Sequence, residues 1–479
     1  MTGSSLNNRW VDNIDWKTIL IYLGLVVGGW LTIYSANYTG ESASLFDLGQ
    51  RHGMQLVWIG VSLFIAVVLL LLDDRYYHML AYPAYGLSVA VLLFTLFFGR
   101  EVNAAKAWIF IGNTAIQPAE FVKYTTSLAL ARYMSRDSFD INNLNDLIRV
   151  GVLLLIPSAI IVAQNDTGSA VVFASFLLVL YREGLNGWIC LAIVMSVVLF
   201  VLSLLLTPAA VVFVLAAFCF LLAGALDGEW RRKAVLMSAM ALGALTLYFG
   251  INLLLGVRIS MYPCLLISCG TGAAYALAYA YKNILRNLLY VVLIFVGGCL
   301  FSATSDFVFD RMLQTHQQKR IMLLLGIESD PQAWGYNVNQ SEIAIGSGGF
   351  LGKGFLEGTQ TRYDFVPEQG TDFIFSTVGE QWGFVGASAT VALFAMLIFR
   401  LMRMGDRQRD TFRKVYCYCV AAVFFTHVVI NIGMTIGVMP VIGIPLPFFS
   451  YGGSSFLAFS LLFFTAVKLD AGKKELLSY

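Results

Sequence analysis

The sequence predicts an all-α polytopic integral membrane protein with about fourteen transmembrane helices and one long extracytoplasmic loop. Its composition is the first reason: hydrophobic residues make up 58% of the chain and charged residues 13%, against about 25% charged residues in ordinary soluble proteins. The mean hydropathy of +0.74 agrees. Apolar runs long enough to cross a bilayer also follow one another along the chain, and Lys and Arg collect between alternate pairs of runs.

The apolar runs define the expected helices in order. The first fifteen residues are polar and no cleavage-type small-residue site follows, so the first run is expected to be a retained anchor and not a signal peptide. The runs centre on residues 16–35, 54–72, 77–98, 118–134, 147–164, 168–182, 188–206, 209–226, 233–255, 259–281, 288–304, 372–400, 414–435 and 450–468.

The positive residues give the expected orientation, because cytoplasmic loops carry an excess of Lys and Arg. With both chain ends in the cytoplasm, residues 305–371 form the long loop outside the membrane. The short outside loops then keep Arg51, Arg100, Lys106 and Arg258. The inside loops collect Arg75, Arg132, Arg136, Arg149, Arg182, Arg231, Arg232, Lys233, Lys282, Arg286, Arg403, Arg407, Arg409, Arg413, Lys414, Lys473 and Lys474.

Charge and cysteine usage exclude two classes of function. The net charge of +2 is small and no basic patch interleaved with aromatic residues appears, so we expect no nucleic-acid partner. The seven cysteines all lie in apolar runs without the spacing of metal ligands. We interpret them as small buried hydrophobic residues.

Four segments interrupt the apolar pattern: 108–123 (WIFIGNTAIQPAEFVK), 164–170 (QNDTGSA), 335–376, and 431–455, in which Gly and Pro break an otherwise spanning run. Hydrocarbon tolerates a broken run only where it is buried in protein or lines a wet cavity, so 431–455 is a candidate site. In this order the segments resemble the SEDS family (shape, elongation, division and sporulation), membrane enzymes that polymerise peptidoglycan glycan strands. The strings IAIGSGG and GTQ make the chain more similar to RodA, the elongation type, than to FtsW, the division type.

The resemblance covers about residues 10–187 and 288–470, and it implies an insertion, because members of the family usually have about ten spans. We therefore expect five segments. They are 1–187 with the first six spans of the SEDS-type helical bundle, 188–287 with inserted transmembrane helices, 288–304 as the span before the catalytic loop, 305–371 as that loop, and 372–479 with the C-terminal spans.

Glu120 and Lys123 are charged residues at the start of the run 118–134, and charge at membrane depth is a candidate for function. Pro118 suits the first turn of a helix, and a spacing of three places the two side chains on one face, where they can pair. Two interpretations stay open. Either the pair locks helix packing, or Lys123 faces an outer cavity and binds an anionic phosphate while Glu120 holds it in place.

Trp108 and Asp166 lie in the first two motifs, and the resemblance assigns both to substrate binding. Trp108 matches a family tryptophan whose preceding Arg is Ala107 here, so Lys106 is a candidate to replace that Arg. Asp166 lies in a short turn between two runs. Either it caps the next helix by accepting from backbone amides, or its carboxylate contacts substrate.

Asp330 is the expected catalytic residue. It precedes Pro331 in the long loop, where an Asp is more often a turn residue, but the resemblance places the family's essential aspartate on it. Glycan polymerisation joins a sugar hydroxyl to an anomeric carbon that carries a lipid pyrophosphate, and Asp330 would take the hydroxyl proton as general base. The candidates to neutralise the departing pyrophosphate are Lys123, Lys319, Arg320 and Lys353.

Four further residues belong to the last two motifs or to the spans beside them. Gln340 and Ser450 are assigned to substrate binding. Glu380, in the span after the loop, matches a family carboxylate and is interpreted as structural. His427, inside a predicted span, is interpreted as a helix-packing partner and not as a base.

The resemblance also implies a cofactor, a substrate and a partner. A divalent cation, Mg or Mn, is expected, although no His/Asp cluster in the sequence identifies its ligands. The expected substrate is lipid II, the undecaprenyl-linked disaccharide pentapeptide. The expected partner is a class B penicillin-binding protein, a transpeptidase, and the expected location is the bacterial inner (cytoplasmic) membrane.

Two alternatives to an elongation-type polymerase remain. Many spans, broken helices and charge within the membrane are also typical of a lipid II flippase or transporter. Against this, the sequence shows no internal repeat by inspection, and the key carboxylate falls in an outer loop and not at the midplane. A division-type, FtsW-like polymerase would share the same chemistry.

Overall fold

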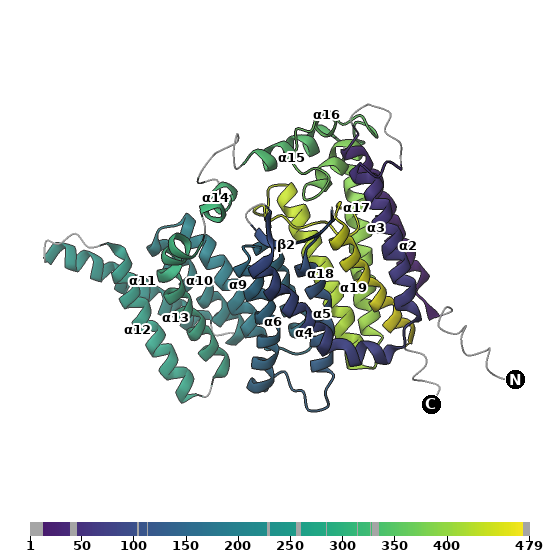
Figure 1. Cartoon of the computed structure of the whole chain (residues 1–479). Coiled ribbons are helices and arrows are strands. Elements are labelled where there is room, and N and C mark those ends of the chain that lie inside the picture. Colours follow the sequence, from purple (N-terminus) through teal and green to yellow (C-terminus); the bar gives the residue numbers. More distant parts are fainter. Residues whose placement is uncertain are drawn as a thin grey trace. The chain divides into compact units, whose positions relative to one another are not determined.

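The computed structural model describes residues 13–38, 46–102, 105–112, 114–227, 230–254, 260–283, 285–313, 315–325, 327 and 335–472. The chain divides into two compact units. Unit 1 consists of Met1–Leu185 and Ser329–Tyr479, and unit 2 consists of Asn186–Glu328. Both units are mainly helical (Figure 1).

Twelve helices in the described part of the chain are long and apolar enough to cross a membrane, which confirms the predicted polytopic helical architecture. In unit 1 these are α2 (Trp16–Ala36), α3 (Arg51–Leu71), α4 (Asp74–Phe98), α6 (Leu144–Ala163), α17 (Ile374–Asp406), α18 (Thr411–Thr435) and α19 (Gly453–Ala471). In unit 2 they are α9 (Gly187–Leu205), α10 (Pro208–Asp227), α11 (Trp230–Leu254), α12 (Met261–Lys282) and α13 (Arg286–Phe307).

Two further expected spans are shorter in the structure. The run 118–134 forms α5 (Pro118–Met134), whose 17 residues pack against α4, α18 and α19. At about 1.5 Å per residue, α5 is shorter than the ~30 Å hydrocarbon core. The run 168–182 is divided into α7 (Thr167–Val172) and α8 (Phe176–Arg182) by a 3₁₀ turn at Phe173–Ser175. Against the expected count of about fourteen spanning helices, the described residues contain twelve by length and composition.

A three-stranded antiparallel sheet lies between α4 and α5, which the all-helical prediction did not include. Its strands are β1 (Arg100–Val102), β2 (Ala105–Ile111) and β3 (Thr114–Ile116), in the order β1-β2-β3. Ile109 pairs with Ile116, and Gly112 at φ +62° lies in the β2–β3 connection. The β-branched and aromatic residues of β2, Trp108 to Ile111, favour a strand.

The broken segment after α18 closes the core of unit 1. Its Phe448, at φ +63° and 2% exposed, inserts between aromatic rings of three helices. The Phe448 ring centroid lies 4.8 Å from that of Tyr22 and 5.4 Å from that of Phe424. Tyr22 also stacks on Phe463 of α19. This burial agrees with the expectation that such a segment must be enclosed by protein.

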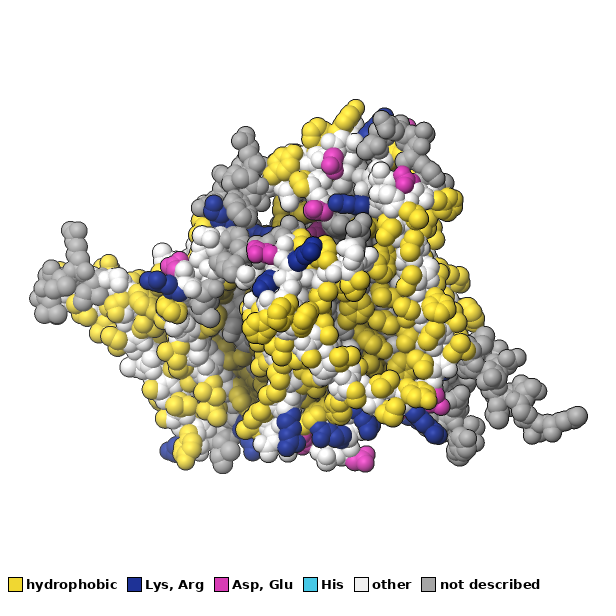
Figure 2. All heavy atoms as spheres, in the orientation of Figure 1, with side chains coloured by type: hydrophobic (Ala, Val, Ile, Leu, Met, Phe, Trp, Pro, Cys, Tyr) yellow, Lys and Arg dark blue, Asp and Glu magenta, His cyan; other side chains and the backbone are white. Residues whose placement is uncertain are grey.

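The surface of unit 1 is typical of a protein in lipid. Figure 2 shows hydrophobic side chains covering the helix sides that face the viewer, while Lys and Arg gather where the helices end, at the bottom of the view. Large apolar side chains such as Phe64, Phe97 and Leu155 are 67–70% exposed. At the opposite helix ends, α15 (Tyr336–Ser347) and α16 (Thr359–Arg362) lie beside α17 (Figure 1).

Unit 2 has a hydrophobic core of its own. It is formed by α9, α10, α12 and α13, with Leu199, Val211, Leu215 and Phe295 among its buried residues. Beyond α13 the chain continues through a π-helical turn at Val308–Met312 and then α14 (Thr315–Leu324). Part of the expected long loop is therefore helical.

Candidate functional site

A buried group of three charged or polar side chains lies where α5 meets α18. Pro118 in the first turn of α5 fixes the helix start, so that Glu120 and Lys123 lie on one face. Lys123 Nζ lies 2.8 Å from Glu120 Oε1 and 2.8 Å from Nε2 of His427, which α18 supplies. Lys123 and His427 have no exposed surface, and Glu120 is 2% exposed.

The contacts of His427 define how the group is held. Its Nδ1 lies 3.0 Å from the carbonyl oxygen of Pro445 in the broken segment. A carbonyl can only accept, so Nδ1 donates, and the Nε2 of the neutral ring is left to accept from the Lys123 ammonium. The ring of Phe459 on α19 packs edge-to-face on His427, with its centroid 5.4 Å from Lys123 Nζ. The group therefore joins α5, α18, α19 and the broken segment.

This geometry differs from the expectation that Lys123 faces an outer cavity. Its ammonium is enclosed, because His427 and Phe459 occupy the face of α5 from which the Glu120–Lys123 pair projects. Glu120 Oε2 is buried and has no hydrogen-bond partner among the described residues. An unpaired buried carboxylate oxygen is costly. The Glu120 carboxylate therefore depends on the Lys123 ammonium to offset its buried charge.

Asp166 acts as a helix cap, one of the two roles considered. Its Oδ1 accepts from the Ser169 backbone amide at 3.0 Å at the start of α7. Its Oδ2 accepts from Gln117 Nε2 at 2.6 Å, and Gln117 is the N-cap residue of α5. Asp166 thereby ties the starts of two helices together. Contact of its half-buried carboxylate with a substrate stays a prediction.

Trp108 lies half-buried in β2, opposite Arg100 of β1. The neighbouring Lys106, considered as a replacement for a missing Arg, donates from Nζ to the carbonyl of Phe97 at 2.8 Å. Lys106 thus anchors the sheet to the end of α4.

Glu380 accepts hydrogen bonds from the loop that precedes it. This agrees with its interpretation as a structural residue. Its carboxylate is fully buried near the start of α17 and accepts from Lys353 Nζ at 2.8 Å. Thr361 donates to it from both its amide, at 2.9 Å, and its hydroxyl, at 2.6 Å. The amide of Gln360 adds a bond of 2.8 Å. Lys353 is therefore engaged in a partly exposed ion pair and is less free to bind a phosphate than the sequence indicated.

The two chain segments 350–354 and 381–385 approach closely beside this ion pair. Gly352, at φ +83°, lies against the backbone of Gln381, where a Cβ would come within 2.1 Å of the carbonyl oxygen. Gly383, at φ +60°, produces a kink in α17 on the same side. Only glycine fits two backbones this close at these angles.

Ser450 and Asn431 form hydrogen bonds with backbone groups of the broken segment and of residues 371–372. The Ser450 hydroxyl accepts from the Leu446 amide at 2.8 Å and donates to the Thr371 carbonyl at 2.6 Å. Asn431 Nδ2 donates to the carbonyls of Asp372 and Ile444. Ser450 is 3% exposed, so its hydroxyl is occupied by the protein. Gln340 lies half-buried on α15.

The expected catalytic residue, Asp330, lies outside the described residues. Lys319 and Arg320 lie on α14 of unit 2, where Lys319 is exposed and Arg320 half-buried. Among the residues that the structure describes, no three His, Cys, Asp or Glu side chains are grouped to hold a metal ion. The roles of these residues and of a divalent cation stay predictions.

Ion pairs gather at the opposite end of unit 1, the end predicted to be cytoplasmic. Arg400 binds both oxygens of Asp15, at 2.5 and 2.7 Å, and Arg407 pairs with Asp470. Burial raises the pKa of the Asp15 carboxyl, but the hydrogen bonds and charge of Arg400 outweigh it and hold that pKa below its ordinary value. These pairs hold α2, α17 and α19 together at their ends.

Sequence reasoning missed the partnership of His427 with Lys123. No spacing connects two residues 304 positions apart, and His427 carried only the general signal of a polar side chain in an apolar run. It also missed that the 353–361 segment supplies the donors for Glu380. Both contacts depend on which helix faces meet.

Comparison with known proteins places the chain in a family. The sequence profile of the FtsW, RodA and SpoVE proteins, described as cell cycle proteins, matches residues 16–218 and 283–475. The unmatched residues 219–282 fall within unit 2. The peptidoglycan glycosyltransferase RodA of Treponema pallidum (strain Nichols) is 31% identical over 448 residues, which cover 93% of this chain and 95% of that protein.

Two solved structures have the same fold. A chain in the structure of a peptidoglycan synthase complex, concerned with the coordination of polymerization and crosslinking, aligns with a TM-score of 0.58 and 22% identity over 96% of this chain and 98% of that chain. The rod shape determining protein RodA of Thermus thermophilus aligns with a TM-score of 0.54 and 21% identity over 96% of this chain and 97% of its own. The chain therefore belongs to the FtsW/RodA/SpoVE family of cell cycle proteins, the SEDS family that its four motifs indicated.

Proposed function

We propose that this protein is a peptidoglycan glycosyltransferase that polymerises lipid II into glycan strands during cell elongation. The observation that carries the proposal is the 31% identity, over almost the full length of both chains, to a RodA protein named for this activity. Within unit 1, hydrogen bonds and ion pairs fix the start of α5, the α5–α7 junction and the 353–361 part of the proposed catalytic loop.

In the proposed reaction a sugar hydroxyl attacks the anomeric carbon of lipid II and the lipid pyrophosphate leaves. Asp330 takes the proton from the attacking hydroxyl. Lys319, Arg320 and Lys353 stabilise the negative charge that builds on the pyrophosphate. Lys123 can join them only by leaving His427, because its ammonium is enclosed between His427 and Glu120.

A divalent cation, Mg or Mn, remains part of the proposal on the resemblance alone. The described residues supply no fitting ligand set, and the orphaned oxygen of Glu120 belongs to a carboxylate that already pairs with an ammonium. No step of the proposed reaction is therefore assigned to a metal.

The proposed setting is the bacterial cytoplasmic membrane, with both chain ends in the cytoplasm and residues 305–371 outside. The distribution of Lys and Arg supports this orientation. A class B penicillin-binding protein is the proposed partner, since a chain of the same fold occurs in a peptidoglycan synthase complex. A transpeptidase would crosslink the strands that this protein makes.

Polymerisation of lipid II by the purified full-length chain with its partner tests the proposal directly. Products are separated on a gel. Asp330→Asn should abolish polymer formation, while Glu357→Gln, which removes an exposed carboxylate from the same loop, should leave it at the parent level. Polymer from Asp330→Asn at the parent rate would remove Asp330 from the reaction. Transfer of lipid II across vesicle membranes without polymer would favour the flippase.

A further inference from the structure

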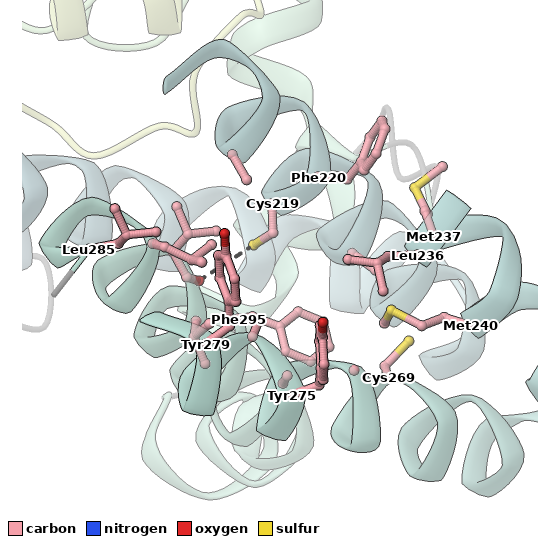
Figure 3. Close-up of a pocket in the computed structure, with 18 of the residues that line it drawn as sticks. Cys219, Phe220, Leu236, Met237, Met240, Cys269, Tyr275, Tyr279, Leu285 and Phe295 are labelled. Atoms are coloured by element: carbon pink, nitrogen blue, oxygen red, sulfur yellow. Dashed lines mark hydrogen bonds between the residues drawn. The ribbon is translucent and has the colours of Figure 1, made fainter. Parts of the chain in front are cut away.

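Unit 2 contains a hollow of about 570 Å³ that the proposed glycosyltransferase reaction does not use. Four helices line it, each with residues spaced to lie on one face: Cys219 and Ala223 of α10, Met240 of α11, Ala276 and Tyr279 of α12, and Leu288 of α13. Figure 3 shows these helices around the hollow, with sulfur, aromatic and aliphatic groups at its wall. Its size falls within the range of small-molecule sites, roughly 300–1,000 Å³.

The chemistry of the wall determines the kind of occupant. Protein interiors are packed with few voids larger than a water molecule, so a hollow of this size is unusual. Apolar cavities exclude water, because a buried water needs two to four polar partners. The wall is mostly aliphatic, aromatic and sulfur-containing, and Tyr275, 50% exposed, shows that it opens at the surface. The occupant must therefore be apolar along most of its length.

The hollow extends over only part of the membrane thickness. Along α10 its lining runs from Ala216 to Ala223, along α13 from Leu288 to Phe295, and along α12 from Cys269 to its C-cap Asn283. At about 1.5 Å per residue the longest of these stretches is ~21 Å, which is shorter than the ~30 Å hydrocarbon core. A transmembrane helix of a partner would need a groove along the whole span. A lipid acyl chain from one leaflet fits the observed length.

Positive charge lies at one end of the hollow. Asn283 and Leu285 line that end, and the exposed cations Lys282 and Arg286 lie beside them in the sequence. Neither cation forms an ion pair with another described residue of unit 2. The neighbouring Tyr281 is 88% exposed, as is typical of an aromatic side chain at the membrane–water interface. Basic residues at such a position bind the head groups of anionic lipids.

We propose that the hollow between α10, α11, α12 and α13 is a binding site for an anionic phospholipid. One acyl chain fills the hollow, and the phosphate of the head group pairs with Lys282 and Arg286. The lipid is drawn from the leaflet at that end, which the distribution of charges predicts to be the cytoplasmic one. Of the four helices, α11 and α12 lie outside the segments that match the family profile, α13 lies within them, and α10 is divided between the two.

Native mass spectrometry of the full-length chain tests the site. The protein is incubated in detergent with palmitoyl-oleoyl phosphatidylglycerol, or with phosphatidylethanolamine that has the same chains. We expect preferential retention of phosphatidylglycerol. Ala276→Phe, which fills the hollow, should reduce retention of both lipids about tenfold. This is the effect expected when about two methylenes of the acyl chain lose their buried place. Ala278→Phe places the same side chain on an exposed position of α12 and should retain lipid like the parent.

The charge is tested separately. Lys282→Gln with Arg286→Gln should lower retention of phosphatidylglycerol by about fivefold for each cation and lower that of phosphatidylethanolamine less, because the ammonium of its head group already offsets its phosphate. The matched control, Lys17→Gln with Arg75→Gln, removes one exposed Lys and one exposed Arg from unit 1 and should change neither. Ala276→Leu provides a smaller filling if Ala276→Phe does not fold. Parent-level retention by folded hollow-filling variants, or equal retention of the two lipids by the parent, overturns the proposal.

Discussion

The ammonium of Lys123 lies at 2.8 Å from both Glu120 Oε1 and His427 Nε2, and so joins α5 to α18 across 304 residues of sequence. Within one helix, Glu120 and Lys123 would form an ordinary i, i+3 pair of small value. Full burial changes its energetics, because a charge left alone in this interior costs several kcal/mol. The group therefore connects α5 and α18 through buried charge.

Lys123→Met should destabilise the protein by about 3 kcal/mol, because it leaves the Glu120 carboxylate buried without its partner. Glu120→Gln combined with Lys123→Met should restore most of that loss. Thermal unfolding in detergent measures both, and a double variant as unstable as the single one contradicts this account. If the double variant is stable but does not polymerise lipid II, the charge itself is needed for activity.

Glu380→Ala should release the 353–361 segment from α17. The substitution removes the acceptor of Lys353, Gln360 and Thr361, and we expect a loss of about 3 kcal/mol in the free energy of unfolding. Protease cleavage within residues 353–361 should become faster. Glu357→Gln, in the same segment but exposed, serves as the control and should change neither quantity. Unchanged cleavage in Glu380→Ala would show that other contacts hold the segment.

The Asp15–Arg400 contact predicts acid sensitivity. The pKa of Asp15 is lower in the folded protein than the ordinary value of about 3.9, so the unfolded state binds more protons between these two pKa values. The stabilisation from Asp15 is therefore present above about pH 4 and is lost as the pH falls through the folded-state pKa. The difference in melting temperature between the parent and Asp15→Asn should shrink over that window. A constant difference would contradict the assigned pKa direction.

Single cysteines at Ser138 and Arg362, in a background without the native cysteines, test the membrane orientation. Both positions are exposed in the structure. A membrane-impermeant thiol reagent added to intact cells, with access through any outer membrane, should label position 362 and miss position 138, because the Lys and Arg distribution places 136–146 in the cytoplasm. Labelling both in lysed cells is the control. The reverse pattern would place the proposed catalytic loop in the cytoplasm and exclude an outward-facing polymerase.

The sequence by itself determined the features that depend on neighbours along the chain. Spanning helices follow from the length of apolar runs, because each backbone group within a bilayer must be satisfied inside its own segment. The Glu120–Lys123 pair and the Asp166 cap follow from spacings of three residues, which a helix or its first turn brings together. Four ordered motifs were sufficient to indicate the family.

The tertiary structure alone decided which distant groups meet. Lys123 could have faced a cavity, but the packing of α18 and α19 on α5 encloses it with His427 and Phe459. Ser450 could have faced a substrate, but the fold of the broken segment directs its hydroxyl to Thr371. The helical periodicity of a sequence indicates which residues share a face. Which other helix packs against that face depends on the packing of all the helices together. For that reason the hollow of unit 2 could not be predicted from the sequence either.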